Sequence, residues 1–272
     1  MIFLLTSKII KSIEYVADVI DAVDILYCIH CFLTICLITK VLKKFNFGDC
    51  NKNQKEGVPY MKILILGAAG QIGRMVTTKL LEETNHQVIL YARNAHSRLG
   101  TSDPGRVEIV DGDFNDQEKL DNVMHEVDLV YLNDMNSPTA TAAIITSMKK
   151  AGVPTIIGAT ILGIYDEVAG EFGKWNTRMV GTAGIDRHKE SAEIIEASGV
   201  NYTLLRLTWL YNQKDNEDYM TTEKGEPFIG AQVTRQAVTL LIMQIIENPN
   251  QFKNSSLGVS EPDTDWPKPS FY

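Results

Sequence analysis

Cysteine is missing from most of this chain. All four cysteines among its 272 residues stand before Met61, and residues 61–272 contain none. Two of them form the motif Cys28-x-x-Cys31, whose spacing occurs in metal and redox sites. Because no second ligand pair follows at metal spacing and the motif lies in an apolar stretch, we interpret these thiols as buried or membrane-facing. We expect no metal site.

Positive charge is scarce as well. The chain has 26 lysines and arginines against 34 aspartates and glutamates, which gives a net charge of −8. No basic run exceeds two residues. Since nucleic-acid-binding proteins usually present a basic patch, we expect no nucleic-acid partner. With 44% hydrophobic and 22% charged residues, the composition fits one large or two small globular domains with a sizeable core.

Long hydrophobic runs are also lacking. The apolar stretch over residues 25–38 contains His30 and reaches roughly 21 Å at ~1.5 Å per residue, short of the ~30 Å hydrocarbon core of a bilayer. Acidic residues precede it where a signal peptide needs positive charge. We therefore expect any membrane contact to run through residues 25–42 alone.

Residues 1–60 form an N-terminal extension with no visible chemistry, predicted to be helical or poorly ordered. Apolar residues at helical spacing from Ile9 to Tyr27 predict an amphipathic helix. Three interpretations stay open, namely a marginal membrane anchor, a packing helix, or translated sequence upstream of the natural start. We favour the last, because Met61 stands one residue before the first predicted strand.

The segment after Met61 has the order strand, glycine turn, helix. Lys62–Leu66 predicts a buried first strand, and apolar residues then recur at helical spacing. Between them, Gly67 permits a tight turn, Gly70 lets the backbone approach a pyrophosphate, and Gly73 lets the helix pack close to the strand. The helix N-terminus is then suited to an anion. Because the spacing is G-x-x-G-x-x-G and not the G-x-G-x-x-G fingerprint, an ordinary turn without a ligand is the alternative.

Strands and helices alternate along the rest of the chain, which predicts an α/β fold with a doubly wound parallel sheet. We expect a single domain over residues 61–272, whose C-terminal third forms a substrate lid over the sheet's carboxyl edge. A glycine-rich loop is expected to carry Tyr165, Trp175 and Arg178, and Thr234 is expected to cap the last helix. The expected strands are 87–92, 107–110, 128–132, 154–157, 201–206 and a short one within 228–233. Helices are expected around 120–124 and over 139–151, 188–198 and 237–246.

Arginines near the second strand indicate which dinucleotide is bound. Arg93 follows that strand at the position where an acidic residue favours NAD and an arginine accommodates the 2′-phosphate of NADP. Arg74 and Arg98 are candidates to complete a cationic clamp. For each arginine, a solvated surface position is the alternative. Asp113 is expected to reach the adenine edge, and Asn133 follows a strand at its carboxyl end.

These features together resemble the atypical short-chain dehydrogenase/reductase superfamily, in particular compact NAD(P)H-binding members related to NmrA-like and flavin/biliverdin-reductase-B-like proteins. The resemblance runs from Met61 to the C-terminus. It implies an NAD(P)-binding Rossmann fold, NADP as cofactor with NAD as the alternative, and a cytoplasmic location. Besides the glycine turn, Arg93 and Asp113, it rests on the strand ending at Thr160, Lys189-x-x-x-Glu193, Ser198–Arg206, Gly163–Asp166, Trp175-Asn176, Trp209-Leu210 and Val233–Arg235.

The resemblance also implies a catalytic set, from which this chain departs. The superfamily uses a tyrosine four residues before a lysine, together with a serine or threonine hydroxyl. Lys189 matches the lysine and Thr160 the hydroxyl, but Ile185 occupies the tyrosine position. Tyr165 and His188 are candidate replacements, with a packed aromatic residue and a surface histidine as the alternatives.

Three functions follow from this reading. The first is NADPH-dependent reduction of a small carbonyl, quinone or flavin-like acceptor, the second a non-catalytic NADP-binding redox sensor of the NmrA-like type, and the third a nucleotide-sugar epimerase or dehydratase. A small-molecule acceptor is the expected partner, and the sequence leaves the oligomeric state open. The acceptor pocket is expected to be built from Met135, Tyr165, Trp175, Trp209 and the C-terminal loop. The residues expected to contact the cofactor are Gly67, Ala69, Gly70, Gln71, Ile72, Gly73, Arg74, Arg93, Asp113, Asn133 and Lys189.

Overall fold

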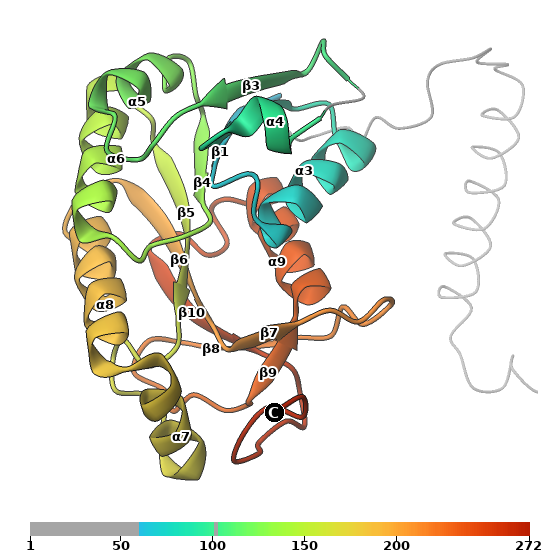
Figure 1. The fold of residues 1–272 in the computed structure, drawn as a ribbon, viewed down its shortest axis with the longest axis vertical. Helices are drawn as coiled ribbons and strands as arrows, with labels where there is room; N and C mark the ends of the chain where they lie inside the picture. Colours follow the sequence, from blue (N-terminus) through green and yellow to red (C-terminus); the bar gives the residue numbers. More distant parts are fainter. Residues whose placement is uncertain (1–59, 101–102) are drawn as a thin grey trace, which may run out of the picture. The chain divides into compact units, whose positions relative to one another are not determined.

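The computed structural model describes residues 60–100 and 103–272 (Figure 1). The predictions made for residues 1–59, including membrane contact through residues 25–42, lie outside the described residues. Within the described part, no helix is long and apolar enough to cross a membrane.

An eight-stranded sheet forms the centre of the described chain. Its strands are β1 (Lys62–Leu66), β2 (Gln87–Ala92), β3 (Val107–Asp111), β4 (Leu129–Leu132), β5 (Thr155–Ile161), β6 (Asn201–Leu207), β8 (Met220–Thr222) and β10 (Ser255–Ser260). They lie in the order β3-β2-β1-β4-β5-β6-β10-β8, and only β8 is antiparallel to its neighbour. The order changes direction between β1 and β4, where sheets of this kind bind ligands. The predicted doubly wound α/β fold of the NAD(P)-binding Rossmann type is therefore confirmed.

Helices cover both faces of the sheet (Figure 1). α3 (Gln71–Glu83) and α9 (Arg235–Glu247) pack together on one face, while α5 (Gln117–Val123), α6 (Pro138–Ala151) and α8 (Thr182–Glu196) follow one another on the other. The remaining elements are α4 (Ala95–Arg98), α7 (Gly170–Val180) and a separate pair of parallel strands, β7 (Trp209–Tyr211) and β9 (Gln232–Thr234).

The first strand shows why its sequence is apolar throughout. Ile63 and Ile65 belong to the core beneath α3 and α9, whereas Leu64 and Leu66 belong to the core beneath α5, α6 and α8. All four side chains have 0% exposure. A parallel strand that is buried on both faces needs apolar residues at every position, which explains why this run predicted a strand without alternating polarity.

Trp175 and Arg178 lie on a helix, so the glycine-rich loop predicted for them was wrong. α7 buries Phe172, Gly173 and Asn176. Gly173 itself is needed for packing, because a Cβ there would overlap the carbonyl of Val168. A helix whose buried face consists of one turn, one position of it glycine, leaves almost no periodic signal in the sequence.

The chain after β6 also departs from the prediction. β10 was not expected, yet it pairs in parallel with β6. Its run Ser255–Ser260 is poor in the β-branched and aromatic residues that mark strands. Gly258 suits this position, since a Cβ there would collide with Thr222 and with the ring of Phe228. Of the strand expected over 228–233, only Gln232 and Val233 lie in a strand, β9. Closure of the remaining segment over a ligand stays a prediction.

Candidate functional site

The glycine turn between β1 and α3 is held tightly against β2. Gly67 has a φ of +83°, a conformation that residues with a Cβ rarely adopt. The backbone N–H groups of Gly67 and Ala68 both donate to the Tyr91 carbonyl, at 2.9 and 3.3 Å. A Cβ on Gly73 would stand 3.0 Å from backbone atoms of both Ala68 and Gly67, so only glycine lets α3 begin this close to β1.

The N-terminus of α3 has the features of a phosphate site. Its N-cap is Gly70, no side chain caps it, and its first turn has no acidic residue. The first N–H groups of a helix have no partner within the helix, and the helix dipole favours an anion beside them. A Cβ on Gly70 would overlap Nδ2 of Asn133. This open cradle of backbone fits the pyrophosphate of a dinucleotide.

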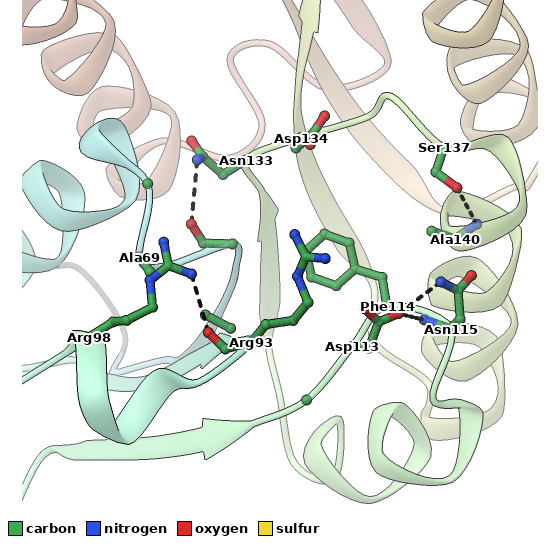
Figure 2. A pocket seen from close by; sticks show the side chains of 14 residues that line it. Ala69, Arg93, Arg98, Asp113, Phe114, Asn115, Asn133, Asp134, Ser137 and Ala140 are labelled. Atoms are coloured by element: carbon green, nitrogen blue, oxygen red, sulfur yellow. Dashed lines mark hydrogen bonds between the residues drawn. The ribbon is translucent and has the colours of Figure 1, made fainter.

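A first cavity of about 340 Å³ opens from this turn (Figure 2). It lies along the carboxyl ends of β1, β2, β3 and β4, where the strand order changes direction. Sequence reasoning identified Gly67, Ala69, Gly70, Arg93, Arg98, Asp113 and Asn133 as site residues, and did not include Ala92, Gly112, Phe114, Asn115, Asp134, Ser137 or Ala140. The lining residues are Gly67, Ala69, Gly70, Ala92, Arg93, Arg98, Gly112, Asp113, Phe114, Asn115, Asn133, Asp134, Ser137 and Ala140.

Two of the three expected clamp arginines line this cavity. Arg93 and Arg98 do so, and Nη1 of Arg98 donates to the Arg93 carbonyl at 3.2 Å (Figure 2). Arg74 does not line it. Its guanidinium instead donates to the Ala69 carbonyl at 3.1 Å and to the Arg98 carbonyl at 2.6 Å. Arg74 thus ties the glycine turn to the end of α4, which positions Arg98.

The wall opposite the glycine turn is a rigid loop around Asp113. Its carboxylate accepts hydrogen bonds from the backbone and side-chain nitrogens of Asn115, at 2.9 and 2.8 Å. These hydrogen bonds, with a smaller contribution from the charge of Arg93, lower the pKa of Asp113. The Tyr91 hydroxyl donates to the Asp113 carbonyl at 2.8 Å, and burial raises the pKa of Tyr91 to about 12. The loop therefore presents a fixed negative charge beside Arg93.

A second cavity, of about 360 Å³, shares Asn133 and Asp134 with the first. Two hydrogen bonds hold the Asn133 side chain in place. The buried Tyr131 hydroxyl donates to Oδ1 of Asn133 at 2.7 Å, and Nδ2 of Asn133 donates to the Gly67 carbonyl at 3.4 Å. The two cavities thus adjoin along one edge of the sheet. The second is lined by Gln71, Ile72, Asn133, Asp134, Ala159, Thr160, Ile161, His188, Leu207, Thr208, Leu210 and Arg235.

Thr160 and His188 meet inside the second cavity. Oγ1 of Thr160 lies 3.2 Å from Nδ1 of His188, and the two residues are 2% and 9% exposed. Thr160 stands near the end of β5 and His188 on the inner face of α8. Burial lowers the pKa of His188 below its usual 6.5, so its imidazole is neutral at neutral pH.

Tyr165 and Lys189 are not brought to this pair. The Tyr165 hydroxyl donates to Oε1 of Glu196 at 2.6 Å, and its ring lies under Lys224 and beside Arg206. Burial raises the pKa of Tyr165. Lys189 is half-buried on α8, and neither Tyr165 nor Lys189 lines the first or the second cavity.

The residues from which the sequence predicted an apolar and aromatic acceptor pocket likewise do not line these two cavities. Met135 is fully buried in the core beneath α6 and α8. Trp175 and Trp209 pack against each other, with ring centroids 4.8 Å apart, and both contact Tyr272. The second cavity is bounded by aliphatic and polar residues in their place.

Comparisons with known proteins agree with this geometry. A family model described as NAD(P)H-binding matches residues 67–249, beginning at the first glycine of the turn. A short-chain dehydrogenase/reductase from Veillonella parvula, solved in complex with NADP, is 33% identical with a TM-score of 0.76 and covers 78% of this chain and 100% of its own. A Rossmann-fold NAD(P)-binding family protein from Shigella flexneri is 31% identical with a TM-score of 0.65, over 79% of this chain and 100% of that chain.

A curated relative carries a named activity. It is the (4-alkanoyl-5-oxo-2,5-dihydrofuran-3-yl)methyl phosphate reductase of Streptomyces griseus, 27% identical over 146 residues, which cover 53% of this chain and 46% of that reductase. The chain thus matches about half the length of this relative. From the family match and the Veillonella structure, the chain belongs to the NAD(P)H-binding oxidoreductases of the short-chain dehydrogenase/reductase superfamily.

Proposed function

We propose that this chain uses NADPH to reduce a small carbonyl, quinone or flavin-like acceptor bound in the second cavity. One observation carries the proposal: the cavity at the glycine turn and the cavity that contains Thr160 and His188 share Asn133 and Asp134. A dinucleotide held by the residues of the first cavity would therefore lie next to the second. NADPH supplies a hydride when bound, and a cavity adjoining its site is where an acceptor receives that hydride.

The chain's own residues hold the cofactor in three places. The α3 N-terminus and Gly70 suit the pyrophosphate, while Arg93 and Arg98 suit the phosphate that distinguishes NADP from NAD. The NADP bound in the Veillonella structure supports this choice of cofactor. Asn133, which accepts a hydrogen bond from the Tyr131 hydroxyl, lies between the two cavities and would orient the part of the dinucleotide bound there.

Thr160 and His188 are the groups placed to act on the acceptor. The Thr160 hydroxyl is able to donate a hydrogen bond to an acceptor oxygen, and His188 orients that hydroxyl across 3.2 Å. A neutral imidazole is a weak proton source at neutral pH. The site therefore suits acceptors whose reduced form takes its proton from water, such as quinones and flavins, better than carbonyls that need an acid in the protein.

NADPH oxidation against a panel of quinones, flavins and aldehydes tests the reaction. Turnover should exceed the free-solution rate and should fall when Thr160→Val removes the hydroxyl at nearly constant volume. Thr146→Val is the matched control, because Thr146 lies on α6 and lines neither cavity. Unchanged turnover in Thr160→Val would remove this hydroxyl from the proposed reaction.

Cofactor choice has its own test. Arg93→Ala should weaken NADPH binding about tenfold or more and leave NADH binding nearly unchanged, because a charge-assisted hydrogen bond contributes roughly 1.5–3 kcal/mol. Lys253→Ala, at a distant lysine, serves as the control for net charge. Equal affinity of the parent protein for NADH and NADPH would show that the arginines do not read the phosphate.

The second candidate is a redox sensor that binds NADP without catalysis. It is favoured by Ile185 at the usual tyrosine position and by the distance of Tyr165 from the second cavity, where its phenol is committed to Glu196. Tight NADPH binding with no turnover above the free-solution rate across the whole panel would support this candidate over the reductase.

A further inference from the structure

Arg235 stands where a positive charge is disfavoured. It is the first residue of α9, whose first turn has no acidic residue, and the N-terminal end of a helix favours anions over cations. The residue is half-buried, and burial lowers the pKa of Arg235. Among the ion pairs of the described residues, Arg235 takes part in none. A cation in this setting is stabilised by an anion that the described chain does not supply.

The guanidinium is held at the second cavity by two amide side chains. Nη1 of Arg235 donates to Oδ1 of Asn212 at 3.2 Å, and Nδ2 of Asn212 donates to Oε1 of Gln71 at 3.0 Å. Gln71 and Arg235 both line the cavity that contains Thr160 and His188. Among the described residues, the Arg235 side chain forms no hydrogen bond other than the one to Asn212, so its other N–H groups remain for a ligand.

The backbone at Arg235 is fixed as well. Thr234 caps α9, as the sequence predicted, because its Oγ1 accepts from the Ala237 N–H at 3.0 Å and donates to the Asn216 carbonyl at 2.7 Å. Asp134, the acidic residue of the same cavity, is exposed and forms no ion pair with Arg235 in the described structure. Arg235 is therefore a preorganised donor whose charge is not neutralised locally.

We propose that Arg235 binds an oxyanion of the acceptor, so that the preferred substrates are carboxylated or phosphorylated molecules whose reducible group lies at Thr160. Arginine presents paired N–H donors that match a carboxylate or phosphate. The reduction itself rests on the proposed function, whereas recognition of the anion does not require turnover.

A pair of probes of nearly equal shape separates charge from fit. Calorimetric titration of 4-carboxybenzaldehyde and of methyl 4-formylbenzoate into the NADP⁺-bound protein measures binding without reaction. We expect the carboxylate to bind about 10- to 100-fold more tightly than the ester. Arg235→Gln should abolish that difference and Arg235→Lys should retain part of it. Lys214→Gln removes an exposed charge from the neighbouring loop without altering the cavity lining, and should behave as the parent protein does.

The outcomes distinguish the sources of an anion. Equal binding of the two probes, or binding of neither, overturns the proposal. If Arg235→Gln instead weakens NADP⁺ binding by the same factor as probe binding, the anion belongs to the cofactor and the proposal also fails. If the carboxylate binds more tightly than the ester but no turnover is found, the Arg235 anion site stands and the proposed reductase activity fails. If turnover is found but the two probes bind equally, the reductase activity stands and the anion site fails.

Discussion

Replacing Gly70 with alanine perturbs the point where the glycine turn meets Asn133 at the proposed cofactor site. Gly70 has a φ of −71° and a ψ of 163°, which alanine adopts without strain. The substitution therefore acts through its methyl group alone. That methyl would overlap Nδ2 of Asn133, and Asn133 is held by the Tyr131 hydroxyl at 2.7 Å.

The expected magnitude follows from what Asn133 must give up. If its amide moves aside, the hydroxyl of Tyr131, a residue with 0% exposure, loses its acceptor. A buried polar group left unpaired costs about 1–3 kcal/mol, so the free energy of unfolding should fall by that amount. The new methyl also occupies space needed by the cofactor's phosphates, and we expect NADPH affinity to fall about tenfold or more, which corresponds to ~1.4 kcal/mol.

Fluorescence titration with NADPH and urea unfolding measure the two effects separately. Gly100→Ala is the matched control, because no described residue has an atom within 4 Å of a Cβ placed there. Gly73→Ala should differ in kind, since its methyl would press on backbone atoms of Ala68 and Gly67 that have little freedom to move. If Gly70→Ala bound NADPH and unfolded as the parent protein does, neither the fixed position of Asn133 nor the close approach of phosphates to this turn would stand.

Three further outcomes are expected. Arg206 and Glu167 form an ion pair at 2.9 Å, and their side chains are 0% and 3% exposed. Arg206→Met should lower the free energy of unfolding, measured with urea, by about 3–5 kcal/mol, because Glu167 is left without its cation. Adding Glu167→Gln should restore much of that loss, and no restoration would contradict the pairing. Burial lowers the pKa of His188 below 6.5 in the folded protein, so the unfolded chain binds a proton at a higher pH than the folded chain does. The free energy of unfolding should therefore decline as the pH falls below about 6.5. Unfolding measured at two pH values should show a smaller decline for His188→Asn than for the parent protein. Aldehyde reduction should rise as the pH falls through the same range while quinone reduction stays level, and parallel profiles would exclude His188 as the proton source.

The sequence predicted strands β1 to β6 of the central sheet but not β8 or β10, and most of the predicted strands are buried on both faces. Runs such as Lys62–Leu66 and Gln87–Ala92 are apolar at nearly every position, and all but the first residue of each is buried. The glycine turn was predictable in part for a local reason, since Gly67 adopts a positive φ and a Cβ on Gly73 would press on the backbone of Ala68 and Gly67.

The residues of the second cavity, where we propose that the acceptor binds, were predicted less well because contacts between residues distant in sequence form it. Tyr165 was a reasonable candidate by residue type, but its hydroxyl is claimed by Glu196, 31 positions later. Arg235 is held at the cavity by a hydrogen bond to Asn212, which in turn donates a hydrogen bond to Gln71. Asn212 and Gln71 are 141 positions apart in the sequence. No periodicity or spacing in the sequence records such contacts.

Ile185, His188 and Lys189 together explain how this site differs from the pattern of its superfamily. His188 and Lys189 stand three and four residues after Ile185 on α8, so each is a neighbour of Ile185 on the helix surface. Ile185 packs against the core in the position where a phenol would be expected, and His188 lies one turn further on, where its ring meets Thr160. The hydroxyl is thus retained, but its titratable neighbour is an imidazole kept neutral by burial. We therefore expect such a site to hold and orient an acceptor more readily than it protonates one, and this is the physical reason to test quinones and flavins first.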